Sequence, residues 1–266
     1  MIKNLLCVLI PHYNAFADLK ASLASISPNE NIDVLIVDDG SQVSPKLEEI
    51  KPFFAGKGTI HLLVLDKNGG IENALNKGLE YIIKSQYEFV ARLDAGDICA
   101  PDRFAKQQEF LVKNKDILLV GSWVTYVSAD KSLIFQRKFP TNYKEIRKVM
   151  YYENVLIHPA VAFRTSVVSK VGFYPTNFPA CEDYAWFMSI CENGKVANIP
   201  EFLLEYVLSP GSISHRKRTA QTISKFRIVC KHFRFRTYCI YGLFKFGLLI
   251  ILPYSLVKKI KAILYK

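Results

Sequence analysis

Runs of apolar residues, each closed by residues typical of turns, recur along the first half of the chain. Near-continuous runs of Val, Ile and Leu are typical of strands that other elements cover on both faces. We therefore predict strands at residues 5–10, 33–38, 60–65, 87–93 and 116–127.

Amphipathic segments lie between these runs. Leucine and isoleucine recur at intervals of three and four residues in 18–26 and 71–85, as on one face of a helix. A further helix is expected over residues 103–114, with Asp102 as its N-cap. Strands that alternate with helices predict an α/β fold with a mainly parallel sheet.

Short polar clusters follow four of the predicted strands. They are PHYN at 11–14, DDGS at 38–41, DKNGG at 66–70 and DAGD at 94–97. Ligands of open α/β sheets bind beyond the carboxyl ends of the strands. Each cluster alone fits an ordinary polar loop, but their joint occurrence indicates a binding site at this edge of the sheet.

Two of these clusters have residue types that suit a nucleotide. Asp-Gly is a common turn dipeptide, but Asp38 or Asp39 could instead accept an N–H of a nucleobase, with Gly40 allowing close approach. The glycines of 66–70 could form a simple turn, or their amides and the following helix N-terminus could face a diphosphate. Neither a GxGxxG fingerprint nor a Walker motif occurs.

Two acidic pairs could supply chemistry. Asp94 and Asp97 follow the fourth strand, and paired carboxylates suit Mg²⁺ or Mn²⁺, which hold diphosphates by their oxygens. Glu182 and Asp183 precede an aromatic helical stretch. They could simply complement the helix dipole, or one of them could act as a general base.

Charge divides the chain into two regions. The 266 residues are 50% hydrophobic, enough for a sizeable core, and the formal net charge is +11. Residues 206–266 contain thirteen Lys and Arg and no acid, whereas residues 1–205 have 22 basic and 24 acidic residues. We predict a near-neutral globular body over 1–205 and a basic helical extension over 206–266.

The extension combines cations with apolar and aromatic residues. Its longest charge-free run, 246–257, has twelve residues including Pro253, and is too short to span a bilayer readily. Cations that flank such a run suit a peripheral anchor on an anionic membrane surface. Alternatively, C-terminal helices cover the sheet of the body. No nucleic-acid-binding motif occurs, so no nucleic-acid partner is expected.

The cysteines and the N-terminal residues indicate a cytoplasmic setting. The six cysteines show no zinc-binding spacing, which favours a reducing compartment. The first apolar run fits a strand better than a secretory signal. We expect a cytoplasmic protein that is peripheral on the inner face of the membrane.

Six motifs occur in the order seen in family 2 glycosyltransferases. They are Tyr13-Asn14, VDDGS, NGG with ALNKG, RLDAGDICAPDRFAKQ, HPAVAFR and CEDYAWF. Over about residues 5–215 the chain resembles this family, whose fold is GT-A, and in particular bacterial enzymes of capsule, exopolysaccharide or O-antigen synthesis. The QxxRW motif of processive synthases is absent.

The resemblance implies an inverting transfer of a hexose or N-acetylhexosamine from a UDP-sugar to a saccharide acceptor. The expected acceptor is linked to undecaprenyl diphosphate. The residues that it assigns to the nucleotide-sugar are Pro11, Tyr13, Asn14, Asp39, Asn68, Gly69 and Asp94. It assigns Mn²⁺ or Mg²⁺ to Asp94 and Asp97, and the base to Asp183 with Glu182 beside it. His158 lies in a family motif, although a lone histidine is more often structural.

Two positions depart from the family pattern. Gly96 stands where the commonest Asp-x-Asp-Asp motif has its middle aspartate, so either Asp97 takes over the metal contact or metal binding is weakened. Leu75 stands where many members have arginine. Because of Gly96, an alternative interpretation stays open, in which the chain is a membrane-binding or scaffolding module that has lost catalysis. A nucleotidyltransferase of related fold should show a GxGxRLxP-like loop, and PHYNAF stands there instead.

Overall fold

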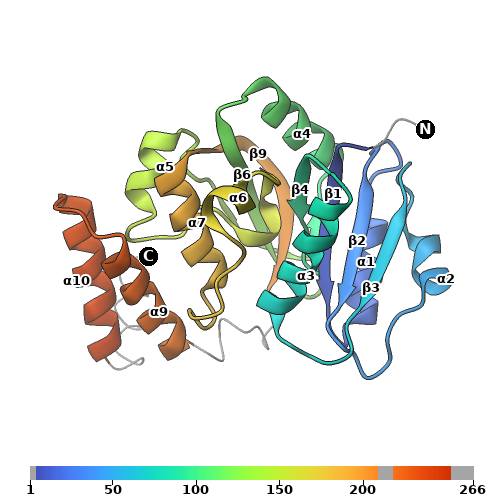
Figure 1. Cartoon of the computed structure of the whole chain (residues 1–266), viewed down its shortest axis with the longest axis horizontal. Helices are drawn as coiled ribbons and strands as arrows, with labels where there is room; N and C mark the ends of the chain where they lie inside the picture. Colours follow the sequence, from blue (N-terminus) through green and yellow to red (C-terminus); the bar gives the residue numbers. More distant parts are fainter. Residues whose placement is uncertain (1–3, 209–217, 253–266) are drawn as a thin grey trace.

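The computed structural model describes residues 4–208 and 218–252 (Figure 1). Its strands form one mixed sheet in the order β3-β2-β1-β4-β8-β6-β9-β5, with β7 paired to β6. The strands are β1 (Leu6–His12), β2 (Asp33–Asp38), β3 (Ile60–Val64), β4 (Phe89–Arg92), β5 (Ile98–Cys99), β6 (Ile117–Ser128), β7 (Leu133–Arg137), β8 (Ala162–Arg164) and β9 (Lys195–Leu208). The α-helices are α1 (Phe16–Ala24), α2 (Leu47–Ile50), α3 (Ile71–Lys84), α4 (Arg103–Lys113), α5 (Tyr143–Val149), α6 (Val167–Val171), α7 (Glu182–Asn193), α9 (Arg218–Lys231) and α10 (Thr237–Ile251).

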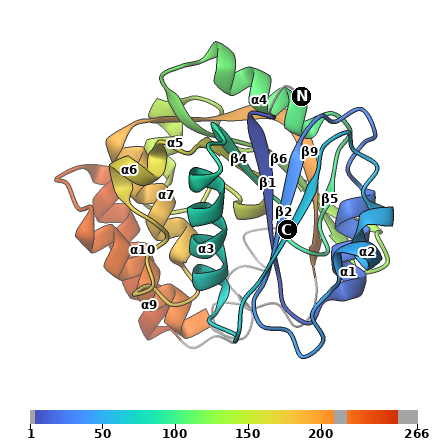
Figure 2. The same cartoon turned by 45° about the vertical axis from the view of Figure 1, so that its right-hand side comes forward.

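The first half of the sheet is parallel. β1 pairs with β2 and β4, and β2 pairs with β3, all in parallel. From β1 the chain continues outward through β2 to β3 and then crosses back to β4 on the other side of β1. Right-handed crossovers therefore place α1 and α3 on opposite faces of the sheet (Figure 2). Leu75, at the position that departs from the family pattern, is fully buried on α3. The predicted α/β fold is confirmed.

The second half of the sheet is built around two long strands. β6 and β9 run parallel to each other, while β8 and β5 join them in antiparallel pairs. The sequence pattern predicted β6 but not β9, whose apolar positions are interrupted by Pro200 and Glu201. The boundary predicted after residue 205 falls inside β9, because this strand continues to Leu208.

The N-terminus of α4 is capped by a distant residue. Asp102 occupies the N-cap position with a left-handed φ of 58° and makes no side-chain capping bond, so its predicted role is wrong. Instead, the buried Glu30 carboxylate accepts hydrogen bonds from the amides of Phe104 at 2.8 Å and Ala105 at 3.0 Å. Because the backbone of Asp102 is left-handed and Glu30 approaches the helix end, the Glu30 carboxylate caps α4 in place of the Asp102 side chain.

The C-terminal helices pack beside α7 rather than on the sheet (Figure 1). The Ser224 hydroxyl on α9 donates to the Pro179 carbonyl at 3.1 Å, and Arg234 forms an ion pair with Glu192 of α7 at 2.6 Å. Within 4–208 and 218–252, no helix is both long and apolar enough to cross a bilayer. Most of the charge-free run 246–257 lies in α10 or outside the described residues.

Candidate active site

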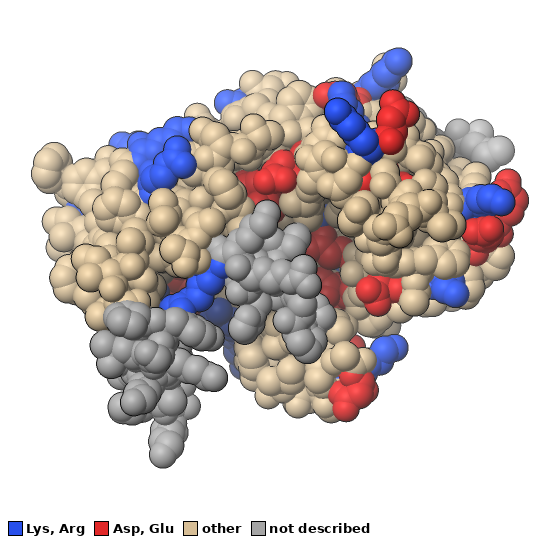
Figure 3. Space-filling view, turned by 90° about the horizontal axis from the view of Figure 1, so that it is seen from below, with Lys and Arg blue, Asp and Glu red and all other residues tan. Residues whose placement is uncertain are grey.

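Two adjoining cavities lie at the carboxyl ends of the parallel strands. The smaller has a volume of about 360 Å³ and the larger about 580 Å³, and Gly70, Ile71 and Asp94 line both. Seen from this end of the molecule, acidic side chains line a central hollow (Figure 3). The polar clusters of the first four strands therefore meet at one edge of the sheet, as predicted.

The smaller cavity has the composition of a nucleoside site. Pro11 and Tyr13 line it from the end of β1, and Asp39 and Asn68 line it from the next two loops. The Asp39 carboxylate is almost fully buried and accepts hydrogen bonds from the amides of Gly69 at 3.0 Å and Gly70 at 2.9 Å. Asp39 thus holds the glycine loop in place while facing the cavity.

Asp38 has a structural role that leaves Asp39 to face the cavity. It is fully buried and bonded to the His12 ring at 2.7 Å, to Ser41 and to Ser44. The Ala15 amide donates to the other ring nitrogen of His12, which places the ring hydrogen on Nδ1, toward Asp38. Burial acts to raise the pKa of Asp38, but these hydrogen bonds hold it below its usual range.

Two loops approach each other closely beside this cavity. Gly40 has a φ of +67°, and a Cβ there would lie 2.5 Å from the Lys67 carbonyl carbon. Asn14 joins the first two loops, because its side-chain oxygen accepts from the Gln42 amide at 2.9 Å. Asn14 and Gly69 are absent from the lining of both cavities, so their predicted contact with the nucleotide stays a prediction.

Asp94 lies on the wall between the two cavities. About a third of its side chain is exposed, and its carboxylate forms an ion pair with the fully buried Arg92 guanidinium. Arg92 also donates to the Leu9 carbonyl at 3.0 Å. A buried arginine thus holds the Asp94 carboxylate at the position where both cavities meet.

Asp97 has a different environment from Asp94. It is 5% exposed, accepts from the Val207 amide at 2.9 Å, and lines neither cavity. Burial, followed by the charge of Asp94, raises its pKa well above the usual range. Among the residues that the structure describes, no three His, Cys, Asp or Glu side chains cluster as metal ligands.

Gly96 separates these two aspartates. Its φ is +106°, a conformation that residues with a side chain rarely adopt, and its amide donates to the Ser22 hydroxyl at 2.8 Å. An aspartate would be strained in this conformation. Of Asp94 and Asp97, only Asp94 lines the cavities. One carboxylate together with substrate phosphates and water is a usual set of Mg²⁺ ligands.

The larger cavity contains the acidic pair at the start of α7. Glu182 and Asp183 both line it, and the Asn154 amide donates to Asp183 Oδ2 at 3.5 Å. Burial raises the pKa of Asp183, while the Tyr184 amide and the Lys225 ammonium act against that rise. Burial and the neighbouring Asp183 charge raise the pKa of Glu182 to about 8. Two adjacent carboxyls therefore differ in environment, which suits separate acid–base roles.

Comparison with known proteins decides the family. Residues 7–172 match the family described as Glycosyl transferase family 2. The chain belongs to this family. An uncharacterised glycosyltransferase of Haemophilus influenzae is 30% identical over 234 residues, which are 86% of this chain and 85% of the relative.

Two further proteins are informative. The UDP-Gal:alpha-D-GlcNAc-diphosphoundecaprenol beta-1,3-galactosyltransferase of Escherichia coli is 30% identical and covers 76% of this chain and 71% of its own length. The crystal structure of S. aureus TarS 1–349 in complex with UDP-GlcNAc superposes with a TM-score of 0.67 at 16% identity, covering 91% of this chain and 71% of that one. This second likeness supports the GT-A fold of the glycosyltransferase.

Sequence reasoning missed much of the far wall of the larger cavity in this glycosyltransferase. Tyr126 and Tyr206, whose ring centroids lie 5.3 Å apart, line it from β6 and β9. Gln221 and Lys225 line it from α9. The one available signal was the absence of acids after residue 205, which pointed to an anionic partner and not to this cavity.

His158 lies in the larger cavity of the glycosyltransferase. Its Nε2 is 3.1 Å from the Tyr174 hydroxyl, and its ring packs against Phe187. Burial, followed by the charge of Arg92, lowers its pKa well below the usual range, so the imidazole is neutral. These contacts fit the structural role that a lone histidine usually has, at a position where one edge can also meet a substrate.

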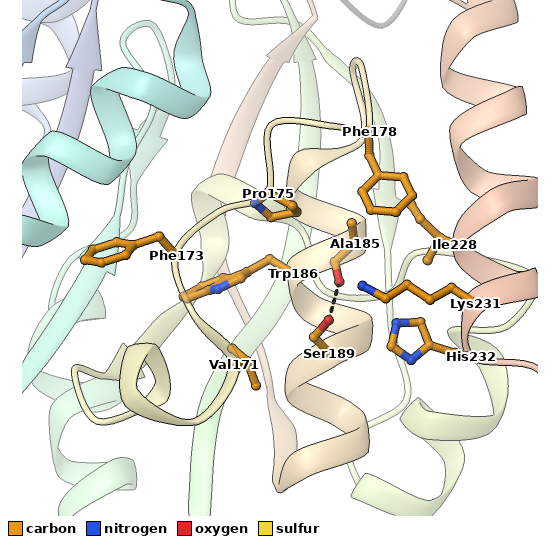
Figure 4. A pocket seen from close by; sticks show the side chains of 10 residues that line it. All are labelled: Val171, Phe173, Pro175, Phe178, Ala185, Trp186, Ser189, Ile228, Lys231 and His232. Atoms are coloured by element: carbon orange, nitrogen blue, oxygen red, sulfur yellow. Dashed lines mark hydrogen bonds between the residues drawn. The ribbon is translucent and has the colours of Figure 1, made fainter.

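A third cavity lies between α7 and α9 of the glycosyltransferase (Figure 4). Its volume is about 70 Å³, and it is lined by Val171, Phe173, Pro175, Phe178, Ala185, Trp186, Ser189, Ile228, Lys231 and His232. It is small, and neither Glu182 nor Asp183 lines it. We regard it as a packing defect between helices.

The raised pKa of Glu182 in the glycosyltransferase predicts a pH-dependent stability. Between its unfolded value of 4.5 and the folded value of about 8, the folded protein holds a proton on Glu182 that the unfolded chain has lost. Stability contributed by this proton is present below pH 4.5 and is lost as the pH rises through about 8. Glu182→Gln removes the penalty, so in urea titrations it should stabilise the protein more near pH 8.5 than near pH 5. An equal change at both pH values would contradict the assignment.

Proposed function

We propose that this glycosyltransferase moves a hexose or N-acetylhexosamine from a UDP-sugar to a saccharide acceptor on a lipid diphosphate of the undecaprenyl type, with inversion. The observation that carries the proposal is the pair of adjoining cavities that share Asp94. One has the nucleoside-type lining with Asp39, and the other has the buried carboxyl pair at α7. The name of the galactosyltransferase relative supports the UDP-sugar donor and the acceptor on a lipid diphosphate, and the resemblance of the motifs supports a place in surface polysaccharide synthesis.

In the proposed reaction, an acceptor hydroxyl attacks the anomeric carbon from the side opposite to the diphosphate. Asp183 takes the hydroxyl proton, the bond from the anomeric carbon to the diphosphate oxygen breaks, and UDP leaves. Glu182, whose pKa of about 8 favours the protonated form near neutral pH, can donate a hydrogen bond to a sugar oxygen. Single displacement of this kind inverts the anomeric configuration.

Asp94 would hold the Mn²⁺ or Mg²⁺ ion, together with the donor diphosphate and water. Such an ion neutralises the charge that develops on the departing diphosphate. The partly exposed Asp94 carboxylate suits this, whereas Asp97 is bonded to the backbone of β9. We therefore assign the ion to Asp94, and Asp97 would join it only if its bond to Val207 opened.

Donor affinity should depend on Asp39. Its carboxylate would accept the uracil N–H, and Asp39→Ala would leave that donor unpaired and loosen the Gly69–Gly70 loop, at a cost of about 1–3 kcal/mol. Calorimetry with UDP measures the loss. Asp66→Ala, which removes an exposed acid outside both cavities in the neighbouring loop, is the matched control. Equal UDP affinity in the Asp39 variant would refute the assignment.

We further propose that the C-terminal extension holds the enzyme on the inner face of the membrane. Cys239, Gly242 and Phe246 are buried on one side of α10. The other side exposes Ile240, Tyr241, Phe244, Leu248 and Ile251. Exposed apolar side chains on a helix in a region with thirteen cations and no acid suit an anionic lipid surface. A lipid-linked acceptor would present its sugar at the same surface.

Binding to anionic vesicles should weaken in high salt without disappearing. Each cation near the surface contributes ~1 kcal/mol that salt screens, while the apolar side chains of α10 add a salt-independent part. Removing residues 238–266 should abolish binding, and Phe244→Glu should weaken it without disturbing the core, since this side chain is 68% exposed. Leu133→Glu, at an exposed apolar position on β7, is the control. Vesicle sedimentation unchanged by these two α10 changes would refute the anchor.

A further inference from the structure

The C-terminal helix α9 places a cation in the active-site cavity. Lys225 is the one lysine or arginine in the lining of the larger cavity, counted over residues 4–208 and 218–252. The other charged lining residues are Glu72, Asp94, Glu182 and Asp183. The Lys225 ammonium bonds to the Gln221 side-chain oxygen at 3.5 Å and forms none of the ion pairs found in the described part of the chain.

Packing fixes the position of Lys225 on α9. The preceding residue, Ser224, is buried and bonds to the Pro179 carbonyl at 3.1 Å, and Gln221 donates to the Ala180 carbonyl at 3.1 Å. One turn further along, the buried Ile228 points toward Phe178 in the loop before α7 (Figure 4). The helix is therefore attached to the segment that leads into the catalytic carboxylates, and the lysine cannot be placed elsewhere without breaking these contacts.

The position of Lys225 is on the acceptor side of the site. It lines the cavity that contains Asp183 and is absent from the nucleoside cavity that contains Asp39. In the proposed reaction, the acceptor hydroxyl lies at Asp183, while the donor diphosphate lies near Asp94. An anionic acceptor that enters a cavity lined by the carboxylates of Glu72, Asp94 and Asp183 is repelled unless a cation receives it.

We propose that Lys225 binds the phosphate groups of an organic diphosphate acceptor whose sugar hydroxyl lies at Asp183. The inference rests on the proposed function, because it takes the acceptor to be phosphate-bearing. Lys225 forms no ion pair with the described residues, and its ammonium has N–H donors left for charge-assisted hydrogen bonds with phosphate oxygens. The C-terminal extension then has two roles: α10 provides a lipid-facing surface, and α9 recognises the charged end of the lipid-linked substrate.

A binding experiment tests this without knowledge of the sugar. Farnesyl diphosphate is titrated into the protein saturated with UDP and Mn²⁺, so that the nucleotide site is already filled. Lys225→Met should weaken farnesyl diphosphate binding at least ~10-fold, and Lys225→Arg should largely retain it. Lys231→Met removes the same charge from the same helix outside the larger cavity and should leave the affinity unchanged.

The same series separates the rival explanations. Equal binding by the wild type and Lys225→Met, or a wild type that binds UDP but no farnesyl diphosphate, overturns the proposal while the proposed function stands. A Lys225→Met variant with weakened UDP binding would move the lysine to the donor site and also overturns it. Failure of the wild type to bind UDP contradicts the proposed function itself. Thermal melting of each variant, with Lys225→Arg as the charge-preserving form, shows whether a loss of binding reflects a loss of fold.

Discussion

Replacing Asp183 with Asn should lower kcat at least ~10²-fold while UDP affinity stays nearly unchanged. The amide keeps the shape of the carboxylate and its oxygen can still accept from the Tyr184 amide, as Oδ1 does, but it cannot accept the proton of the acceptor hydroxyl. Asp183 is suited to this role because it lines the larger cavity, and because the Lys225 ammonium opposes the rise in pKa that burial causes. Steady-state kinetics and UDP calorimetry on the same preparation separate the two effects.

Glu182→Gln is the matched control for this prediction. Glu182 lines the same cavity one residue earlier, and its Oε2 is buried with no hydrogen-bond partner among the described residues. A protonated Glu182 resembles glutamine, so this variant should keep much more activity than Asp183→Asn. If Glu182→Gln is inactive and Asp183→Asn remains active, the roles of the two carboxyls are reversed.

Removal of divalent metal should stop turnover. Charge stabilisation of a leaving group by a bound ion contributes several kcal/mol, so EDTA should lower the rate ~10²-fold or more, and Mn²⁺ or Mg²⁺ should restore it. Asp94→Asn should lose the response to metal, because Asp94 is the partly exposed carboxylate that both cavities share. Asp97→Asn should weaken the response less, since Asp97 lines neither cavity.

Two measurements make the metal prediction decisive. The melting temperature should be the same with and without EDTA, which shows that chelation removes a catalytic ion and not a structural one. Full activity in EDTA would contradict the prediction. Cationic side chains would then stabilise the diphosphate, and Lys225, the one lysine or arginine that lines the larger cavity in the described part of the chain, would be the first to replace.

The parallel half of the fold could be predicted because its signals are local. β2 matches its predicted range of residues, and β1 differs from its predicted range by one residue at its start and two at its end. These strands are buried on both faces, so their apolar runs are continuous. The nucleoside side of the site followed, since a polar cluster directly after a parallel strand must lie at the edge where ligands bind.

The far wall of the larger cavity could not be predicted, because it depends on packing between distant segments. Tyr206 lies in β9, whose apolar pattern is interrupted, and Lys225 lies in a helix that is attached through Ser224 and Pro179. The basic composition of the extension predicted an anionic partner without showing that α9 lines the same cavity as Glu182 and Asp183. The prediction of the α4 cap was wrong for the same reason. Glu30 is 74 residues away from Phe104, whose amide donates a hydrogen bond to the Glu30 carboxylate.

The buried pair of His12 and Asp38 could be predicted only in part, because it depends on the register between two strands that were themselves predicted. The two residues are 26 positions apart, yet they are direct neighbours in the parallel register of β1 and β2. A correct register would have shown that Asp38 is bonded to His12, which leaves Asp39 to face the smaller cavity. Sequence alone left both aspartates open.

The most direct test of the account is a transfer assay with lipid-diphosphate-linked saccharides. A panel of UDP-hexoses and UDP-N-acetylhexosamines is incubated with the enzyme, Mn²⁺ and each acceptor, and the acceptor mass and the released UDP are followed together. We expect at least one UDP-sugar to add a single sugar residue to the lipid-linked acceptor, with release of an equal amount of UDP and with inversion at the anomeric carbon. UDP binding without transfer from any donor to any such acceptor would contradict the account and favour a module that has lost catalysis.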